Sequence, residues 1–208
     1  MGRYRGPVCR LCRREGMKLF LKGERCMSDK CALSRRTYLP GQHGKTKPKL
    51  SEYALQLREK QKVKRMYGVL ERQFKTYFRK ASQAKGVTGE VLLQLLERRL
   101  DNVIYALGFS TSRRQARQIV RHGHVQINGK KVDLPSYLVK VNETIKLVGK
   151  ESFINFIRQN RELSKERPLP AWLELKEDRL EGKVLRLPLR SDIVLPVKES
   201  LIVELYSK

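Results

Sequence analysis

The chain has 208 residues, of which 46 are Lys or Arg and 21 are Asp or Glu, so its formal net charge is +25. Charged residues make up 32% of the chain, above the roughly 25% usual for globular proteins. The excess positive charge repels itself, and binding to an acidic polymer removes that repulsion. We therefore favour a nucleic acid as partner over the alternative that the basic surface is only solvated. An anionic membrane surface fits less well, because no apolar run reaches about 18 residues.

The apolar stripes of the sequence fall in separate blocks, which predicts two small domains rather than one large one. The first residues are basic and lead into cysteines, without the apolar segment of a secretory signal. We therefore expect a cytoplasmic protein.

All four cysteines lie near the start of the chain, as Cys9 with Cys12 and Cys26 with Cys31. Two close pairs across a short connector are typical of tetrahedral zinc sites. Two disulfides are an alternative, but a reducing cytosol argues against them. An iron–sulfur cluster is a minor alternative, because four thiolates do not by themselves select the metal. We expect a structural zinc knuckle that leaves no open position for chemistry.

The segment after the cysteines is rich in Pro, Gly and Lys, which predicts an extended basic arm over residues 40–49. Ser51 can cap a helix that ends near Gly68, and a second helix over residues 70–84 carries an aromatic stripe. In the first helix only Glu52 and Glu59 are spaced to pair with its cations, so we interpret its basic face as a binding surface. The phosphate-binding residues predicted in this half are Lys45, Lys47, Lys49, Arg58, Lys62, Lys64 and Arg65.

Residues 88–148 predict a compact basic module. A leucine-rich helix runs from Thr88 to a left-handed cap at Gly108, and Ser112 caps a short basic helix over residues 113–121. The Asn128-Gly129 pair predicts a hairpin turn. The phosphate-binding residues predicted here are Arg113, Arg114, Arg117, Arg121, His124, Lys130 and Lys131.

The last third of the chain predicts further strands. Residues 139–141 and 144–148 are expected to complete the module's sheet, and residues 172–175 and 183–187 alternate like paired strands around Gly182. The apolar ending at residues 201–206 needs a partner surface, which we expect on the two helices of residues 51–84.

Six groups of residues carry a resemblance to a known family. They are the cysteine pairs, Pro40-Gly41-Gln42-His43-Gly44, residues 57–62 and 97–103, Ser112-Arg113-Arg114-Gln115-Ala116-Arg117, and Leu134-Pro135-Ser136-Tyr137. Over its full length the chain resembles bacterial small-subunit ribosomal protein four, in the branch that bears a zinc knuckle. Residues 98–161 are similar to the RNA-binding module named after that family.

The resemblance implies an α+β protein. Residues 1–50 would form the zinc knuckle and arm, and residues 51–86 a mainly helical domain that a C-terminal segment, about 178–208, completes. Residues 87–177 would form the second domain, in which two helices pack against a small sheet. Cys9, Cys12, Cys26 and Cys31 would be the zinc ligands.

The resemblance also implies a function. Family members bind the 5′ domain of small-subunit ribosomal RNA at a junction of several helices and nucleate assembly of the subunit body. They contact ribosomal protein five of the small subunit, which affects decoding accuracy, and some repress their own messenger RNA. We accordingly expect a cytoplasmic ribosomal component with no membrane and no small-molecule substrate.

Two rival functions remain from the sequence. An RNA-modifying or tRNA-charging enzyme built on the same module would need catalytic groups, and we find no convergent pair of buried acids, no nucleophile beside a base and no nucleotide-binding loop. A duplex-DNA regulator with a zinc knuckle is the second rival, and a binding experiment separates it from the leading hypothesis.

Overall fold

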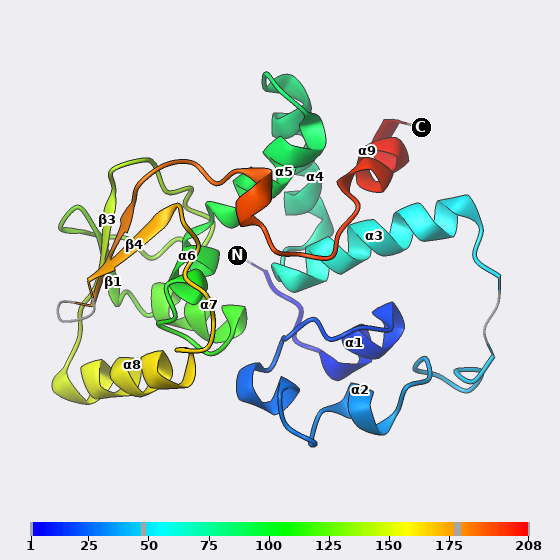
Figure 1. Cartoon of the computed structure of the whole chain (residues 1–208), viewed down its shortest axis with the longest axis horizontal. Helices are drawn as coiled ribbons and strands as arrows, with labels where there is room; N and C mark the ends of the chain where they lie inside the picture. Colours follow the sequence, from blue (N-terminus) through cyan, green and yellow to red (C-terminus); the bar gives the residue numbers. More distant parts are fainter. Residues whose placement is uncertain (1, 47–48, 177–179, 208) are drawn as a thin grey trace. The chain divides into compact units, whose positions relative to one another are not determined.

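The computed structural model describes residues 2–46, 49–176 and 180–207 (Figure 1). The chain divides into two compact units, Met1–Leu92 with Leu195–Lys208, and Leu93–Val194. The C-terminal segment thus belongs with the N-terminal residues, while the long middle segment forms a unit of its own.

The first unit is helical. Its elements are α1 (Cys9–Glu15), a 3-10 helix (Gly23–Cys26), α2 (Ala32–Arg35), α3 (Glu52–Met66), α4 (Glu71–Gln83) and α9 (Glu199–Ser207), and α5 (Thr88–Glu97) begins in it and ends in the second unit. The predicted cap of α3 is confirmed, because Ser51 Oγ accepts the backbone N–H of Ala54 at 3.3 Å.

The C-terminal helix packs on α3 and α4, as its apolar sequence predicted. Figure 1 shows α9, in red, lying against α3, in cyan. Gln56 Nε2 donates to Glu204 Oε2 at 3.0 Å, and the Tyr206 ring stacks on Phe78 with centroids 4.4 Å apart. Ile202 is fully buried in this interface. The packing of α9 on these helices explains why the last turns of the chain are apolar.

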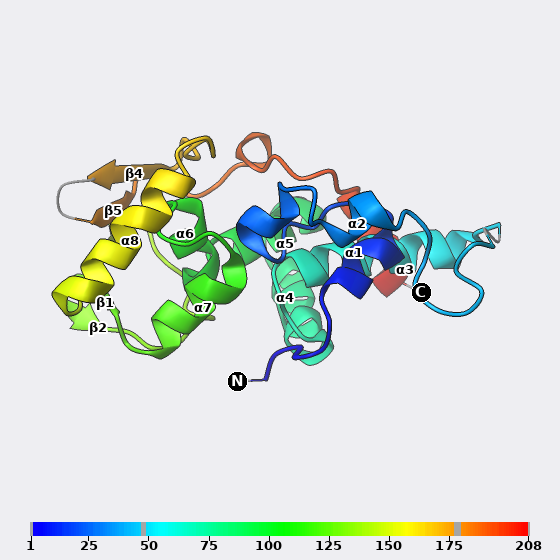
Figure 2. The same ribbon diagram turned by 90° about the horizontal axis from the view of Figure 1, so that it is seen from below.

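The second unit combines three helices with a small sheet. Its elements are α6 (Leu100–Ala106), α7 (Arg113–Arg121), β1 (Val125–Ile127), β2 (Lys130–Lys131), β3 (Thr144–Leu147), α8 (Glu151–Leu163), β4 (Leu173–Lys176), β5 (Glu181–Val184) and a 3-10 helix (Arg190–Asp192). The strands lie in the order β2-β1-β3-β5-β4, and all neighbours are antiparallel. Figure 2 shows α8 lying across the strands. One hydrophobic core joins the three helices to the sheet.

The leucine-rich helix predicted over residues 88–108 is interrupted. Arg99 has extended backbone (φ −64°, ψ 134°) and forms an isolated bridge with Leu138, so α5 ends and α6 begins on either side of it. The amide of Leu100 then donates to Tyr137 O at 2.8 Å. The helical periodicity continues across this break, which is why the sequence pattern does not reveal it. The left-handed cap at Gly108 is confirmed, with φ of 78°.

The sheet differs from the prediction in two places. Residues 139–141 are not a strand, and Gly182 lies within β5 rather than in a turn. A Cβ on Gly182 would lie 2.4 Å from Leu107 Cδ1, so the glycine lets α6 approach the strand closely. Strand β5 also pairs with β3, which joins β4 and β5 to the sheet of the basic module.

Candidate nucleic-acid interface

Helix α7 and the hairpin after it present most of the cations predicted in the second unit. Ser112 Oγ accepts the N–H of Gln115 at 3.3 Å and so caps α7, as predicted. Asn128 and Gly129 both have positive φ, 47° and 79°, and close the predicted turn between β1 and β2. The exposed or half-exposed Arg and Lys residues on these elements are Arg113, Arg114, Arg121, Lys130 and Lys131.

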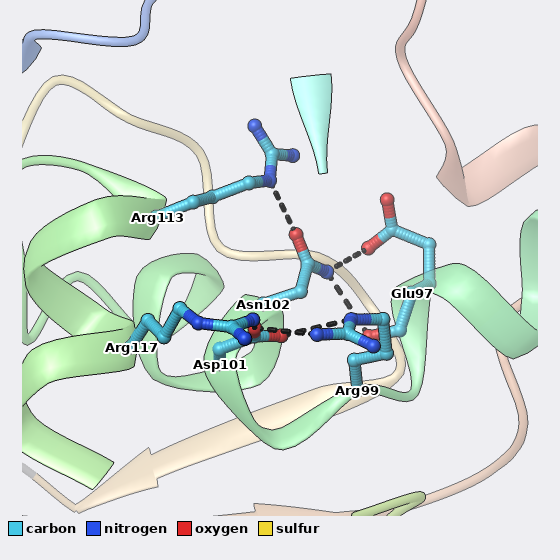
Figure 3. A network of polar contacts seen from close by, with 6 residues as sticks. All are labelled: Glu97, Arg99, Asp101, Asn102, Arg113 and Arg117. Carbon is cyan, nitrogen blue, oxygen red and sulfur yellow. Dashed lines mark hydrogen bonds and ion pairs between the residues drawn. The ribbon is translucent and has the colours of Figure 1, made fainter. Parts of the chain in front are cut away.

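Arg117, between Arg114 and Arg121 along α7, is instead turned into the protein interior. It is 7% exposed, and its Nη1 donates to Asp101 Oδ2 at 3.2 Å. Asp101 also accepts two bonds from Arg99, at 3.0 Å and 2.6 Å (Figure 3). One buried carboxylate therefore holds two guanidinium groups. This position corrects the expectation that Arg117 belongs to a solvent-facing cationic surface.

Arg113 is held by a second part of the same network. Its Nε donates to Asn102 Oδ1 at 2.7 Å, and Asn102 Nδ2 donates to Glu97 Oε2, also at 2.7 Å (Figure 3). The bond to Glu97 fixes which side of the amide faces Arg113. The guanidinium of Arg113 also lies over the Tyr105 ring, 4.5 Å from its centroid. Arg113 is thus oriented by the protein even though it is only half-buried.

His124 also has a structural role. Its ring stacks on Phe153 with centroids 4.0 Å apart, and its Nδ1 lies 3.1 Å from Val148 O. These contacts tie the start of β1 to the end of β3 and to α8. His122, two residues earlier, is exposed, with its ring 6.4 Å from that of His124.

The cations of α3 are paired with carboxylates from other elements. Glu15 of α1 accepts from Arg58 Nη1 at 3.3 Å and from Arg65 Nη1. Glu71 at the start of α4 accepts from Lys60 and Lys64, each at 2.7 Å. The sequence prediction of unpaired cations on this helix is therefore wrong, because it counted only acids within α3.

Lys62 is paired within α3 itself. Its Nζ donates to Glu59 Oε1 and also to the carbonyl of Pro196 at 3.4 Å. Glu59 is one of the two acids whose spacing within the helix allowed such a pair. The four cations predicted on this helix therefore hold the first unit together, and none of them is a simple solvated charge.

Glu15 is the most buried of these acids, with its side chain 1% exposed. Burial raises its pKa, and the charges of Arg65 and Arg58 oppose that rise. Burial likewise lowers the pKa of Arg65, against the effect of Glu15. The carboxylate therefore needs both guanidinium groups beside it. Sequence spacing could not reveal that Glu15 pairs with Arg58 and Arg65, because a long connection separates α1 from α3.

None of the four cysteines forms a disulfide. Cys12, Cys26 and Cys31 are buried and Cys9 is half-buried. Burial raises the pKa of Cys12, and negative charge on the other three sulfurs raises it further, so those sulfurs lie near Cys12. Among the residues that the structure describes, no three His, Cys, Asp or Glu side chains form a group able to hold a metal ion.

Backbone amides donate to sulfurs of the cysteine-containing segment. Lys22 N–H donates to Cys26 Sγ at 3.3 Å, and a bond from the backbone of Leu19 lowers the pKa of Cys12 against the effect of burial. Burial also raises the pKa of Cys31, but bonds from the backbone of Leu33 and Ser34 outweigh it and lower the pKa overall. Sulfur atoms that accept N–H bonds are suited to bearing negative charge.

The segment expected to be an extended arm is compact over residues 39–46. Leu39 N–H donates to Gly44 O at 3.0 Å, and Gly44 N–H donates to Gly41 O at 3.3 Å. Lys45 and Lys49 are exposed, and Lys47 lies outside the described residues. In the part of the chain that the structure describes, no helix is long and apolar enough to cross a membrane.

Known proteins match the chain over its whole length. The family described as the ribosomal protein S4/S9 N-terminal domain matches residues 3–97, and the S4 domain matches residues 98–145. Relatives named small ribosomal subunit protein uS4 come from Thermodesulfovibrio yellowstonii, 60% identical over 208 residues, and Thermus thermophilus, 58% identical over 209 residues. A third, from Thermoanaerobacter pseudethanolicus, is 61% identical over 208 residues. Each match covers 100% of this chain and 100% of the relative. The chain therefore belongs to the family of small ribosomal subunit protein uS4.

Proposed function

We propose that this protein is a structural constituent of the small ribosomal subunit and binds small-subunit ribosomal RNA directly. The observation that carries the proposal is the cationic surface formed by Arg114, Arg121, Lys130 and Lys131. A buried core and a tight hairpin hold these side chains at set positions on α7 and β2. The net charge of +25 supplies the attraction for a polyanion.

Rigid placement of cations suits folded RNA. The major groove of A-form RNA is too narrow for side chains, so proteins recognise RNA helices by shape and by phosphate positions. The site of binding would be the junction of several helices in the 5′ domain, where phosphates converge. Binding there early would nucleate assembly of the subunit body, and the protein would act in the cytoplasm as part of the subunit rather than as an enzyme.

The proposal includes two further partners, one a protein and one a messenger RNA. Contact with ribosomal protein five of the small subunit would contribute to translational accuracy, and binding to the protein's own messenger RNA would repress its synthesis. Both rest on the family resemblance.

Zinc is the cofactor that we propose for the knuckle. The donor set of Cys9, Cys12, Cys26 and Cys31 suits tetrahedral zinc, and the N–H bonds to sulfur described above favour thiolates. Bound zinc would supply folding energy to a segment with few apolar contacts. An iron–sulfur cluster stays the minor alternative. Metal analysis of the purified protein, with far-ultraviolet circular dichroism before and after a chelator, tests the assignment; iron with visible absorption would overturn it.

The RNA proposal is tested by comparing the affinity of the protein for a small-subunit RNA junction and for duplex DNA at equal salt. If about ten phosphates are neutralised, the slope of log affinity against log salt should be about −7 to −9. Equal affinity for RNA and DNA, or a slope shallower than about −2, would contradict the proposal.

A further inference from the structure

The loop over residues 39–46 has a conformation that only glycine allows at two positions. A Cβ on Gly44 would lie 1.9 Å from Leu39 O, and Gly41 has φ of +111°. Gly44 is itself buried, although the residues on either side of it are exposed. The Pro-Gly-Gln-His-Gly motif therefore specifies a shape, beyond being a flexible basic linker.

Arg13 of α1 fastens this loop to the knuckle. Its Nε donates to Tyr38 O and its Nη2 to Leu39 O, both at 3.0 Å, and its guanidinium lies 4.7 Å from the centroid of the Tyr38 ring. The loop is consequently held next to α1. The next residue of that helix, Arg14, is exposed and forms part of the surface that the loop encloses.

The loop and Arg14 line an open, solvent-accessible cavity of about 490 Å³. This volume lies within the roughly 300–1,000 Å³ of known ligand sites. Leu39 and Pro40 form apolar walls, Gln42 and His43 bring hydrogen-bonding side chains, and Arg14 brings a positive charge. All of these residues belong to the first unit of the chain.

The chemistry of the walls matches one unstacked nucleotide. A splayed base of single-stranded RNA needs an apolar or planar surface to stack on and polar groups at its edge. Its phosphate needs a cation such as Arg14. We propose that this cavity takes up one extruded nucleotide of the bound RNA, with the base against Pro40 and His43 and the phosphate at Arg14. The inference rests on the RNA binding proposed above and adds a subsite to it.

The cavity is not a site for nucleotide hydrolysis. Gly44-Lys45-Thr46 has the ending of a phosphate-binding loop, but only two residues separate Gly41 from Gly44, where that motif has four. The described elements on either side are α2, which ends at Arg35, and α3, which begins at Glu52, so no strand leads into the loop. A nucleotide held in the chain of an RNA is thus favoured over a free nucleoside triphosphate.

Three variants of the full chain test the proposal. Arg14→Gln removes the cation of the cavity, and Gly44→Ala disturbs the loop without changing any charge. Arg10→Gln is the matched control, because Arg10 is exposed on the same helix and does not line the cavity. Each variant is bound to a small-subunit RNA fragment at saturating concentration, and the reactivity of every base to a chemical probe is compared with that in the wild-type complex.

We expect one base, protected by the wild-type protein, to become reactive with Arg14→Gln and with Gly44→Ala but not with Arg10→Gln. In a second arm, the four ribonucleoside 5′-monophosphates and inorganic phosphate are titrated while the amide signals of Gly41, His43 and Gly44 are followed by nuclear magnetic resonance. Shifts with a mononucleotide, absent with phosphate alone, would support recognition of the base.

Failure of the cavity is distinguishable from failure of the RNA proposal. If the wild-type protein does not bind the RNA, the function proposed above is wrong. If it binds, but no base becomes reactive in Arg14→Gln, or the same bases do so in Arg10→Gln, only the nucleotide site is overturned. Equal shifts with inorganic phosphate would also overturn it, by showing a simple anion site.

Discussion

Arg117 and Asp101 form a buried ion pair: Arg117 Nη1 donates to Asp101 Oδ2 at 3.2 Å, with side-chain exposures of 9% and 4%. Because Asp101 also binds Arg99, one carboxylate connects α7, the start of α6 and the break before it. Arg117 thus stabilises the packing of the basic helix α7 on its neighbours. The exposed cations of α7, rather than Arg117, are the ones available to bind RNA.

Removal of Asp101 should destabilise the second unit. Asp101→Ala leaves two buried guanidinium groups without their carboxylate, which costs about 3–5 kcal/mol for a buried pair. Urea unfolding followed by the fluorescence of Trp172, which is 1% exposed in the core of that unit, measures the loss. Arg121→Ala, on the exposed face of α7, should change stability by no more than about 0.5 kcal/mol. A cost below about 1 kcal/mol for Asp101→Ala would contradict the structural role.

The hairpin tip is the better probe of RNA contacts. Lys130→Ala combined with Lys131→Ala should weaken RNA binding and reduce the salt slope by up to about two, while stability stays unchanged. Lys176→Ala is the matched control, because Lys176 is exposed on β4, at the opposite edge of the sheet from β2. If the control and the double variant lose equal affinity, the hairpin tip is not a specific contact.

A double variant of Arg113 and Arg117, which the sequence alone suggests as a test of RNA binding, would give an ambiguous result. Arg117→Ala opens the buried network, and Arg113→Ala removes the partner of Asn102. We expect the free energy of unfolding of this variant to fall by about 2–4 kcal/mol, in addition to any loss of RNA affinity. Thermal unfolding before the RNA titration measures the first effect.

Glu15 should hold the cysteine-containing segment against α3. Glu15→Gln keeps the size of the side chain but leaves Arg58 and Arg65 without the carboxylate, at a cost of about 1–3 kcal/mol because both guanidinium groups reach solvent. Amide hydrogen exchange should accelerate in α1 and not in α7. Glu24→Gln, an exposed acid of the same segment, is the control. Unchanged exchange in α1 would show that other contacts hold the segment.

Acid should weaken the contact of α4 with α3 through Glu71. Burial would raise the pKa of Glu71, but hydrogen bonds from Lys60 and Lys64 and their charges outweigh it and lower the pKa from 4.5 to about 2. Because the pKa of Glu71 is lower in the folded protein than in the unfolded chain, its ion pairs stabilise the fold above pH 4.5. This stabilisation is lost as the pH falls through about 2.

The size of this acid effect is limited by solvent. The Glu71 side chain is 46% exposed, so we expect a loss of about 1 kcal/mol rather than the full value of the shift. Urea unfolding of the wild type and of Glu71→Gln at several pH values between about 5 and 2 measures it. The stability difference between the two proteins should shrink toward low pH; a constant difference would contradict the assignment.

Local patterns in the sequence determined much of the fold. The hydroxyl caps at Ser51 and Ser112, the left-handed cap at Gly108 and the Asn128-Gly129 turn depend on backbone groups within a few residues, so sequence spacing reveals them. The apolar C-terminal helix and the cationic hairpin tip were also predictable, because burial and net charge leave a direct mark on composition.

Tertiary structure alone decided which cations form ion pairs within the protein and which are exposed to a binding partner. Glu15 reaches Arg58 and Arg65 across 43 and 50 residues, and Arg117 meets Asp101 across 16, distances at which helical spacing carries no information. The break at Arg99 and the pairing of β5 with β3 likewise depend on segments distant in the chain. The sequence by itself determined that the protein is cationic and where several of its helices begin and end. Only the fold, by pairing charges in its interior, determined which of those cations remain at the surface.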